Sequence, residues 1–121
     1  MSHETWLEQL RRGTLDLAIL LTVSEGPRYG LAIIQHLDAF TDLVVTEGTI
    51  YPILGRLTRE GLLDAYWVED EAPHPRKYYR LSRQGAKRLT HMKSEWQSFA
   101  GKIERLLDAA SAAERNGRDS Q

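Results

Sequence analysis

The chain has 121 residues, a formal net charge of −1 and no cysteine. This length allows one domain, or one domain with an added dimerisation element. The absence of cysteine excludes disulfide scaffolds, thiolate zinc sites and cysteine nucleophiles. The longest apolar run, Leu17–Val23, is too short to cross a bilayer, and residues 1–10 lack the basic start of a signal peptide. We therefore expect an unexported, cytoplasmic protein with no membrane partner.

The charges are distributed unevenly along the chain. Residues 1–47 contain three bases and seven acids, whereas residues 76–93 contain seven bases and no acid. Phosphate binding depends on local charge rather than on the total, so the basic segment is compatible with a nucleic-acid partner. A solvated helix face would have the same composition and remains the alternative.

Two helices are predicted in the first third of the chain. The first covers Thr5–Ser24, with a bend or a restart expected at Gly13-Thr14. Its second half, Leu15–Val23, is almost entirely apolar, which is typical of a helix buried on more than one side. Glu25-Gly26-Pro27 ends this helix, and a second one is predicted at Tyr29–Phe40.

The third predicted helix, Thr46–Glu60, has an unusually small outer face. At about 100° per residue, its apolar stripe consists of Ile50, Ile53, Leu54 and Leu57. The outer face and its flanks are small or able to reach DNA: Gly48, Thr49, Tyr51, Pro52, Gly55, Arg56 and Arg59. We place Pro52 in the first turn, where its missing N–H has no intrahelical partner. Such a face can approach the floor of a major groove, although it would equally suit packing against another protein element.

A β-hairpin is predicted after this helix. A strand at Leu62–Glu69 pairs with Lys77–Leu81 across a loop at Asp70–Arg76. Bases at the tip and on the return strand can lie along a minor groove or its phosphates: His74, Arg76 and Lys77. Helices followed by this hairpin give a mainly α (α+β) fold, a winged helix-turn-helix. We expect Trp6 and Trp67 to be packing residues.

Ser82 is expected to cap a long last helix that carries a coiled-coil seam. Its apolar residues are spaced alternately by three and four positions: Leu89, Met92, Trp96, Phe99, Ile103, Leu106 and Ala110. The seam predicts a homodimer in which this helix packs on its mate, on the mate's first helix, or on both. Trp96, with Met92 and Phe99, would then lie at the dimer interface and line a slot for a planar hydrophobic effector. A purely structural role at the interface is the alternative.

These elements predict a winged helix-turn-helix domain in residues 1–81, a dimerisation helix in 82–110 and a disordered tail in 111–121. The four histidines lack metal-ligand spacing, and no catalytic triad, phosphate loop or paired-carboxylate motif is visible. We therefore expect no metal, no cofactor and no enzymatic activity.

Three segments, in this order, resemble the PadR-like bacterial transcriptional regulators: RGTLDLAILLTVSEGPRYGLAII, EGTIYPILGRLTREGLL and PRKYYRLSRQG. They are similar to the family's opening helix with its Pro-x-Tyr-Gly turn, to its recognition helix, and to its wing. The resemblance covers residues 12–100 and implies a winged-helix domain with a single C-terminal dimerisation helix. It departs at Leu31, where the family usually has an aromatic residue.

The resemblance also implies a function. It implies a repressor of nearby genes that a small molecule releases. The positions it assigns to DNA are Thr49, Tyr51, Pro52, Arg56, Arg76 and Lys77, and it assigns Trp96 to a pore between subunits. The leading hypothesis is a homodimeric repressor that reads an inverted repeat, with recognition helices about 34–36 Å apart. A winged-helix module that binds an acidic protein partner is the alternative.

Overall fold

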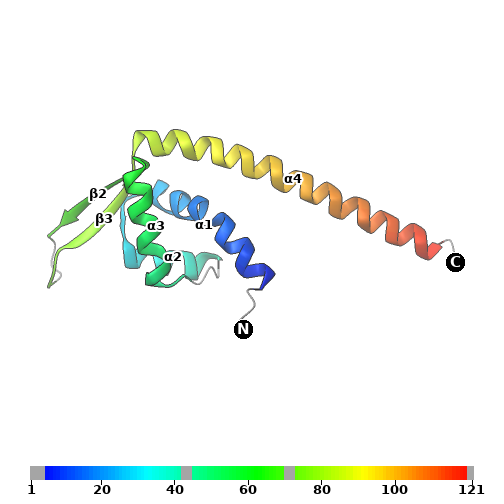
Figure 1. The fold of residues 1–121 in the computed structure, drawn as a ribbon, viewed down its shortest axis with the longest axis horizontal. Coiled ribbons are helices and arrows are strands. Elements are labelled where there is room, and N and C mark those ends of the chain that lie inside the picture. The colour runs from blue at the N-terminus through cyan, green and yellow to red at the C-terminus, as the bar shows by residue number, and fades with distance from the viewer. Residues whose placement is uncertain (1–4, 42–44, 70–72, 120–121) are drawn as a thin grey trace. The chain divides into compact units, whose positions relative to one another are not determined.

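The computed structural model describes residues 5–41, 45–69 and 73–119, and it has the predicted winged-helix fold (Figure 1). Its elements are α1 (Trp6–Ser24), β1 (Arg28–Tyr29), α2 (Gly30–Thr41), α3 (Glu47–Arg59), β2 (Leu63–Val68), β3 (Arg76–Leu81) and α4 (Arg83–Asp119). The chain divides into two compact units, Met1–Leu89 and Thr90–Gln121. The first residues of α4 thus belong to the winged-helix unit, which extends beyond the expected boundary at residue 81.

Helix α1 is continuous, without the break expected at Gly13-Thr14. At its start, the Thr5 hydroxyl accepts a hydrogen bond from the Glu8 amide, and the Glu8 carboxylate accepts one from the Thr5 amide. This reciprocal pair satisfies two amides that the first turn leaves without helical partners. Thr14 does not start a new helix, because its hydroxyl donates instead to the carbonyls of Leu10 and Arg11 in the preceding turn.

The core of the first unit lies where the three helices meet the sheet. Its buried apolar residues are Leu15, Ile19, Leu20, Val23, Ile33, Leu37, Ile50, Leu54, Leu57, Leu62, Leu63, Tyr79 and Leu89. Every element except the two-residue strand β1 contributes to this list, so α3 and the hairpin are held by the same core. Two predicted packing residues lie outside it, since Trp6 is 73% exposed and Trp67 is 66% exposed.

The sheet has three antiparallel strands in the order β1-β3-β2. The predicted hairpin is present, and β2 and β3 are paired from Leu63 opposite Leu81 to Val68 opposite Arg76. Strand β3 therefore begins at Arg76, which the sequence pattern assigns to the loop. Strand β1 was not predicted, and it adds to the other edge of β3 by pairing Arg28 with Tyr79. The hairpin extends beyond α3 and forms the wing (Figure 1).

Ser82 joins the end of the wing to the start of α4, and its predicted capping role is confirmed. Its hydroxyl accepts from the Gly85 amide at 2.9 Å and donates to the Gly61 carbonyl at 2.7 Å. Its own amide donates to the Leu62 carbonyl at 3.1 Å. Gly61 has a φ of 80°, a conformation that favours glycine, and it turns the chain from α3 into β2. The first turn of α4 is therefore fastened to the end of α3.

Helix α4 has 37 residues and continues to Asp119, past the end expected at residue 110. The segment Ala109–Arg115 consists mainly of alanine, glutamate and arginine, which are strong helix formers although they bury little apolar surface. The lack of apolar surface predicts disorder here, whereas helix propensity favours continuation of the helix. None of the helices in the described ranges is both long and apolar enough for a bilayer span.

Candidate nucleic-acid interface

Helix α3 is held in the core by one apolar stripe. Ile50, Leu54 and Leu57 are at most 1% exposed. The helix begins at Glu47, so Pro52 lies in the second turn rather than in the first as expected. Because proline has no N–H, the carbonyl of Gly48 lacks its usual helical donor. Gly48 itself is exposed on the outer face.

The outer face of α3 is narrow and polar at both ends. Thr49, Pro52 and Arg59 are exposed. The Thr49 hydroxyl lies 3.2 Å from that of Thr46. A Cβ added to Gly55 would lie 3.3 Å from an Nη of Arg59, so the guanidinium lies against the glycine. This surface carries a hydroxyl near its start and a positive charge near its end, with little bulk between them.

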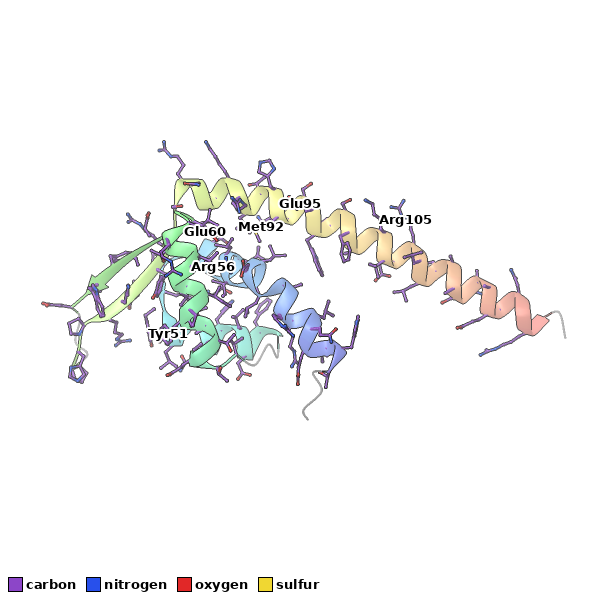
Figure 2. All side chains as sticks on the ribbon, in the orientation of Figure 1. Tyr51, Arg56, Glu60, Met92, Glu95 and Arg105 are labelled. Atoms are coloured by element: carbon purple, nitrogen blue, oxygen red, sulfur yellow. The ribbon has the colours of Figure 1, made fainter. Side chains whose placement is uncertain are left out.

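Arg56 lies on a flank of α3 and contacts two carboxylates of the protein. One Nη lies 2.8 and 2.9 Å from the two carboxylate oxygens of Asp16 in α1, and the other lies 3.2 Å from Glu60. Figure 2 labels Arg56 and Glu60 on this part of the chain. The hydrogen bonds that the guanidinium donates, first to Asp16 and then to Glu60, raise the pKa of Arg56. The guanidinium thus links the predicted recognition helix to α1. Its predicted contact with DNA stays a prediction.

Tyr51 lies on the opposite flank of α3, toward the sheet. Its ring packs over Gly30, where an added Cβ would lie 2.7 Å from the phenol oxygen. Burial raises the pKa of Tyr51, and the charge of Glu47 raises it further. Gly30 therefore provides the space for the ring, and the phenol stays neutral at physiological pH.

The wing carries its bases on both faces, because alternate residues of a strand point to opposite sides. The Arg76 guanidinium lies 4.6 Å from the centre of the Tyr29 ring. The Lys77 ammonium lies 6.0 Å from the rings of both Trp67 and Tyr79. Such contacts orient a cation over the face of an aromatic ring. His74, before β3, is exposed.

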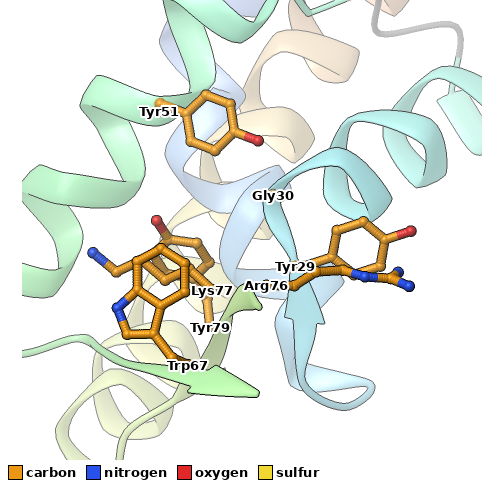
Figure 3. A pocket seen from close by; sticks show the side chains of 7 residues that line it. All are labelled: Tyr29, Gly30, Tyr51, Trp67, Arg76, Lys77 and Tyr79. Atoms are coloured by element: carbon orange, nitrogen blue, oxygen red, sulfur yellow. The ribbon is translucent and has the colours of Figure 1, made fainter. Parts of the chain in front are cut away.

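A hollow of about 440 Å³ lies between α3 and the sheet. Its lining comes from β1, α2, α3, β2 and β3: Tyr29, Gly30, Tyr51, Trp67, Arg76, Lys77 and Tyr79. Figure 3 shows Tyr51 on one side, a group of Trp67, Lys77 and Tyr79 on another, and Tyr29 with Arg76 on a third.

This hollow brings together only part of the predicted DNA-binding set. Tyr51, Arg76 and Lys77 line it, whereas Thr49, Pro52 and Arg59 belong to the outer face of α3. Sequence reasoning missed Gly30, Tyr29 and Trp67 as members. The available signal was a tryptophan next to a basic strand, but the sequence alone did not show that Trp67 is exposed.

The predicted interface residues of α4 belong to the second unit. Trp96 is 42% exposed and Phe99 is 58% exposed, whereas Met92 is half-buried. Their roles at a dimer interface and in effector binding stay predictions. Among the described residues, no group of histidine, aspartate and glutamate side chains is arranged to hold a metal ion.

The comparisons with known proteins agree with this geometry. The sequence profile of the transcriptional regulator PadR-like family matches residues 19–91, more than half of the chain. The chain belongs to the PadR-like family. This is a family of transcription factors rather than enzymes, and the long single α4 places the chain in its short type. The predicted family and the predicted lack of enzymatic activity are thus confirmed.

Several relatives are similar over most of their length. An uncharacterized protein from Lysinibacillus sphaericus is 33% identical over 99 residues, covering 80% of this chain and 91% of the relative. A PadR-like transcription factor from Bacteroides fragilis is 36% identical with a TM-score of 0.71, covering 83% and 96% of the two chains. A PadR-family transcriptional regulator from Eggerthella lenta is 34% identical with a TM-score of 0.75, covering 84% and 88%.

Proposed function

We propose that this PadR-family regulator is a homodimeric repressor, which binds an inverted-repeat operator in double-stranded DNA and is released by a small molecule. The observation that carries the proposal is the exposed, narrow face of α3 next to a wing whose bases are held in position by aromatic rings. A major groove admits a helix, and the adjacent phosphates attract the bases. As a DNA-binding regulator, the protein would act in the cytoplasm.

The proposed contacts fall into two classes. Thr49 and Arg59 reach base edges or phosphates from α3, and Pro52 keeps the helix face thin. The second class consists of residues of the wing and its junction with α3, which contact phosphates or the minor groove: Tyr51, His74, Arg76 and Lys77. For Arg56 the predicted contact with DNA remains untested, and we propose a positioning role as the alternative, because Asp16 and Glu60 already bind its guanidinium.

The proposed dimer uses the seam of α4. Its positions beyond Leu89 carry large apolar side chains that are exposed in the single chain: Trp96, Phe99, Ile103 and Leu106. A second copy would cover them and, by two-fold symmetry, would set the recognition helices about 34–36 Å apart. This spacing matches one turn of DNA, which is why the operator is proposed to be an inverted repeat.

A planar hydrophobic effector is proposed to bind between the two copies of Trp96, with Met92 and Phe99 beside it. Binding would then quench tryptophan fluorescence. Quenching that persists undiminished in Trp96→Phe would contradict this site, since Trp6 and Trp67 would have to be its source.

The experiment that tests DNA binding uses the region upstream of the protein's own gene, with binding measured by mobility shift and fluorescence anisotropy at several salt concentrations. Replacing both Arg76 and Lys77 by alanine should lower the slope of log K against log salt by about two, because each phosphate contact releases about one counterion. The matched control removes two bases of α4, by Lys102→Ala and Arg105→Ala, and should keep the slope.

An unchanged slope in the wing variant would remove the wing from the proposed contacts. The absence of promoter binding at physiological salt would instead favour the module that binds an acidic protein partner.

A further inference from the structure

We propose that the hollow between α3 and the wing is a ligand site for a small, flat aromatic molecule that carries an anionic group, and that this ligand competes with DNA. The site is separate from the proposed effector slot at Trp96, which lies in the other unit of the chain. The competition rests on the DNA-binding function proposed above, whereas the ligand site itself does not.

The walls of the hollow are suited to an aromatic ring. Four aromatic side chains line it, and they come from four different elements: Tyr29, Tyr51, Trp67 and Tyr79. Core packing accounts for Tyr79, which is 5% exposed, but not for Trp67, which is 66% exposed. A ring stacked on the indole would cover this surface, because aromatic groups favour offset or edge contacts.

The charge of the hollow is suited to an anion. Among the described residues, the lining contains two bases, Arg76 and Lys77, and no acid (Figure 3). Burial raises the pKa of both Tyr51 and Tyr79, so their phenols stay protonated at physiological pH. Protonated phenols donate hydrogen bonds to an anion instead of repelling it.

The hollow has the volume of a small-molecule site and lies within the proposed DNA surface. A volume of about 440 Å³ lies within the range of about 300–1,000 Å³ that small-molecule sites occupy. Tyr51, Arg76 and Lys77 also belong to the proposed DNA surface. A ligand bound in the hollow beside Tyr51 and Lys77 would therefore occupy side chains that the duplex needs, and binding of the two would be mutually exclusive.

The probe for the test is 8-anilinonaphthalene-1-sulfonate, a flat aromatic anion whose fluorescence rises on binding. Lys77→Gln should weaken its affinity about tenfold, which is the usual effect of losing a charge-assisted contact. Trp67→Leu should weaken it at least as much. Two matched controls should change it less than twofold: Arg80→Gln, on the same strand but paired with Asp64, and Trp96→Phe, in the other proposed site.

Several outcomes would overturn the proposal. An affinity unchanged in Lys77→Gln and Trp67→Leu would show that the probe does not bind in the hollow, and loss of binding in Trp96→Phe would place it on α4 instead. Absence of any binding by the wild-type protein would also refute the site. Unfolding curves followed by circular dichroism identify a variant that has lost its fold. The affinity for the probe is then measured with Tyr51→Phe in place of that variant.

Competition is tested by displacing a labelled upstream duplex with the probe. The probe should release DNA from the wild-type protein, and the Trp67→Leu variant should bind DNA but resist release. Release that is equal in both proteins, or no release from the wild type, would refute the competition. If no duplex binds, the DNA-binding function fails, and the direct titration alone decides the ligand site.

Discussion

The ion pair between Asp16 and Arg56 allows a test of what holds the recognition helix in place. The perturbations are Asp16→Asn, Arg56→Gln and the double variant. The donor–acceptor distances of 2.8 and 2.9 Å indicate strong hydrogen bonds, but the two side chains are 41% and 37% exposed, so solvent screens the charges. We therefore expect a coupling free energy of about 1 kcal/mol, at the upper end of exposed pairs.

The assay is urea unfolding of the four proteins at one fixed protein concentration, since a dimer's stability depends on concentration. DNA affinity is measured in parallel. If Arg56 positions α3 through Asp16, both single variants should weaken DNA binding by a similar factor, about threefold, with the salt slope unchanged.

Different effects of the two single variants on DNA binding would refute a positioning role for Arg56. If Arg56 binds phosphate directly, Arg56→Gln should lower the salt slope by about one, and Asp16→Asn should strengthen binding by releasing the guanidinium. A coupling energy near zero would show that the pair does not anchor the helix.

Three further predictions concern stability. Gly30→Ala should lower the free energy of unfolding by about 1 kcal/mol, because the new Cβ displaces the end of the exposed Tyr51 ring, and adding Tyr51→Ala should remove this penalty in urea unfolding. Gly85→Ala should lower the free energy of unfolding by about 3 kcal/mol or more, because the new Cβ meets the backbone carbonyl of Leu62, which cannot rotate away. A thermal midpoint equal to that of the wild type would contradict this prediction. Burial raises the pKa of Tyr79, so the free energy of unfolding should fall as pH rises above about 10. In Tyr79→Phe this fall should be less steep. An equally steep decrease in the variant would refute the prediction.

Local patterns predicted most of the fold. The apolar stripe of α3 and the two strands of the wing follow from residue spacing alone. Strand β1 could not be predicted this way, because two residues have no periodicity and the strand exists only through its pairing with β3. The end of α4 was placed too early, because Ala109–Arg115 has high helix propensity but little apolar surface.

The site was harder to predict than the fold. The sequence identified the outer face of α3 and the bases of the wing, because these residues are contiguous or helically spaced. One of the two partners of Arg56 is Asp16, forty residues away, and no local pattern connects them. The residue type of Trp67 predicts packing, whereas the structure leaves this side chain 66% exposed on strand β2.

The hydrogen bonds of Ser82 fix the start of α4 on the winged-helix unit. They therefore limit where residues can be inserted or deleted in evolution. Gly85 and Leu89 at the start of the helix are buried, so this end cannot slide. An inserted residue after Leu89 would turn every later seam position by about 100° about the helix axis and would take Trp96 out of line with Leu89. Insertions and deletions among natural homologues should therefore be rare between Ser82 and Trp96 and more frequent near the C-terminal end of α4.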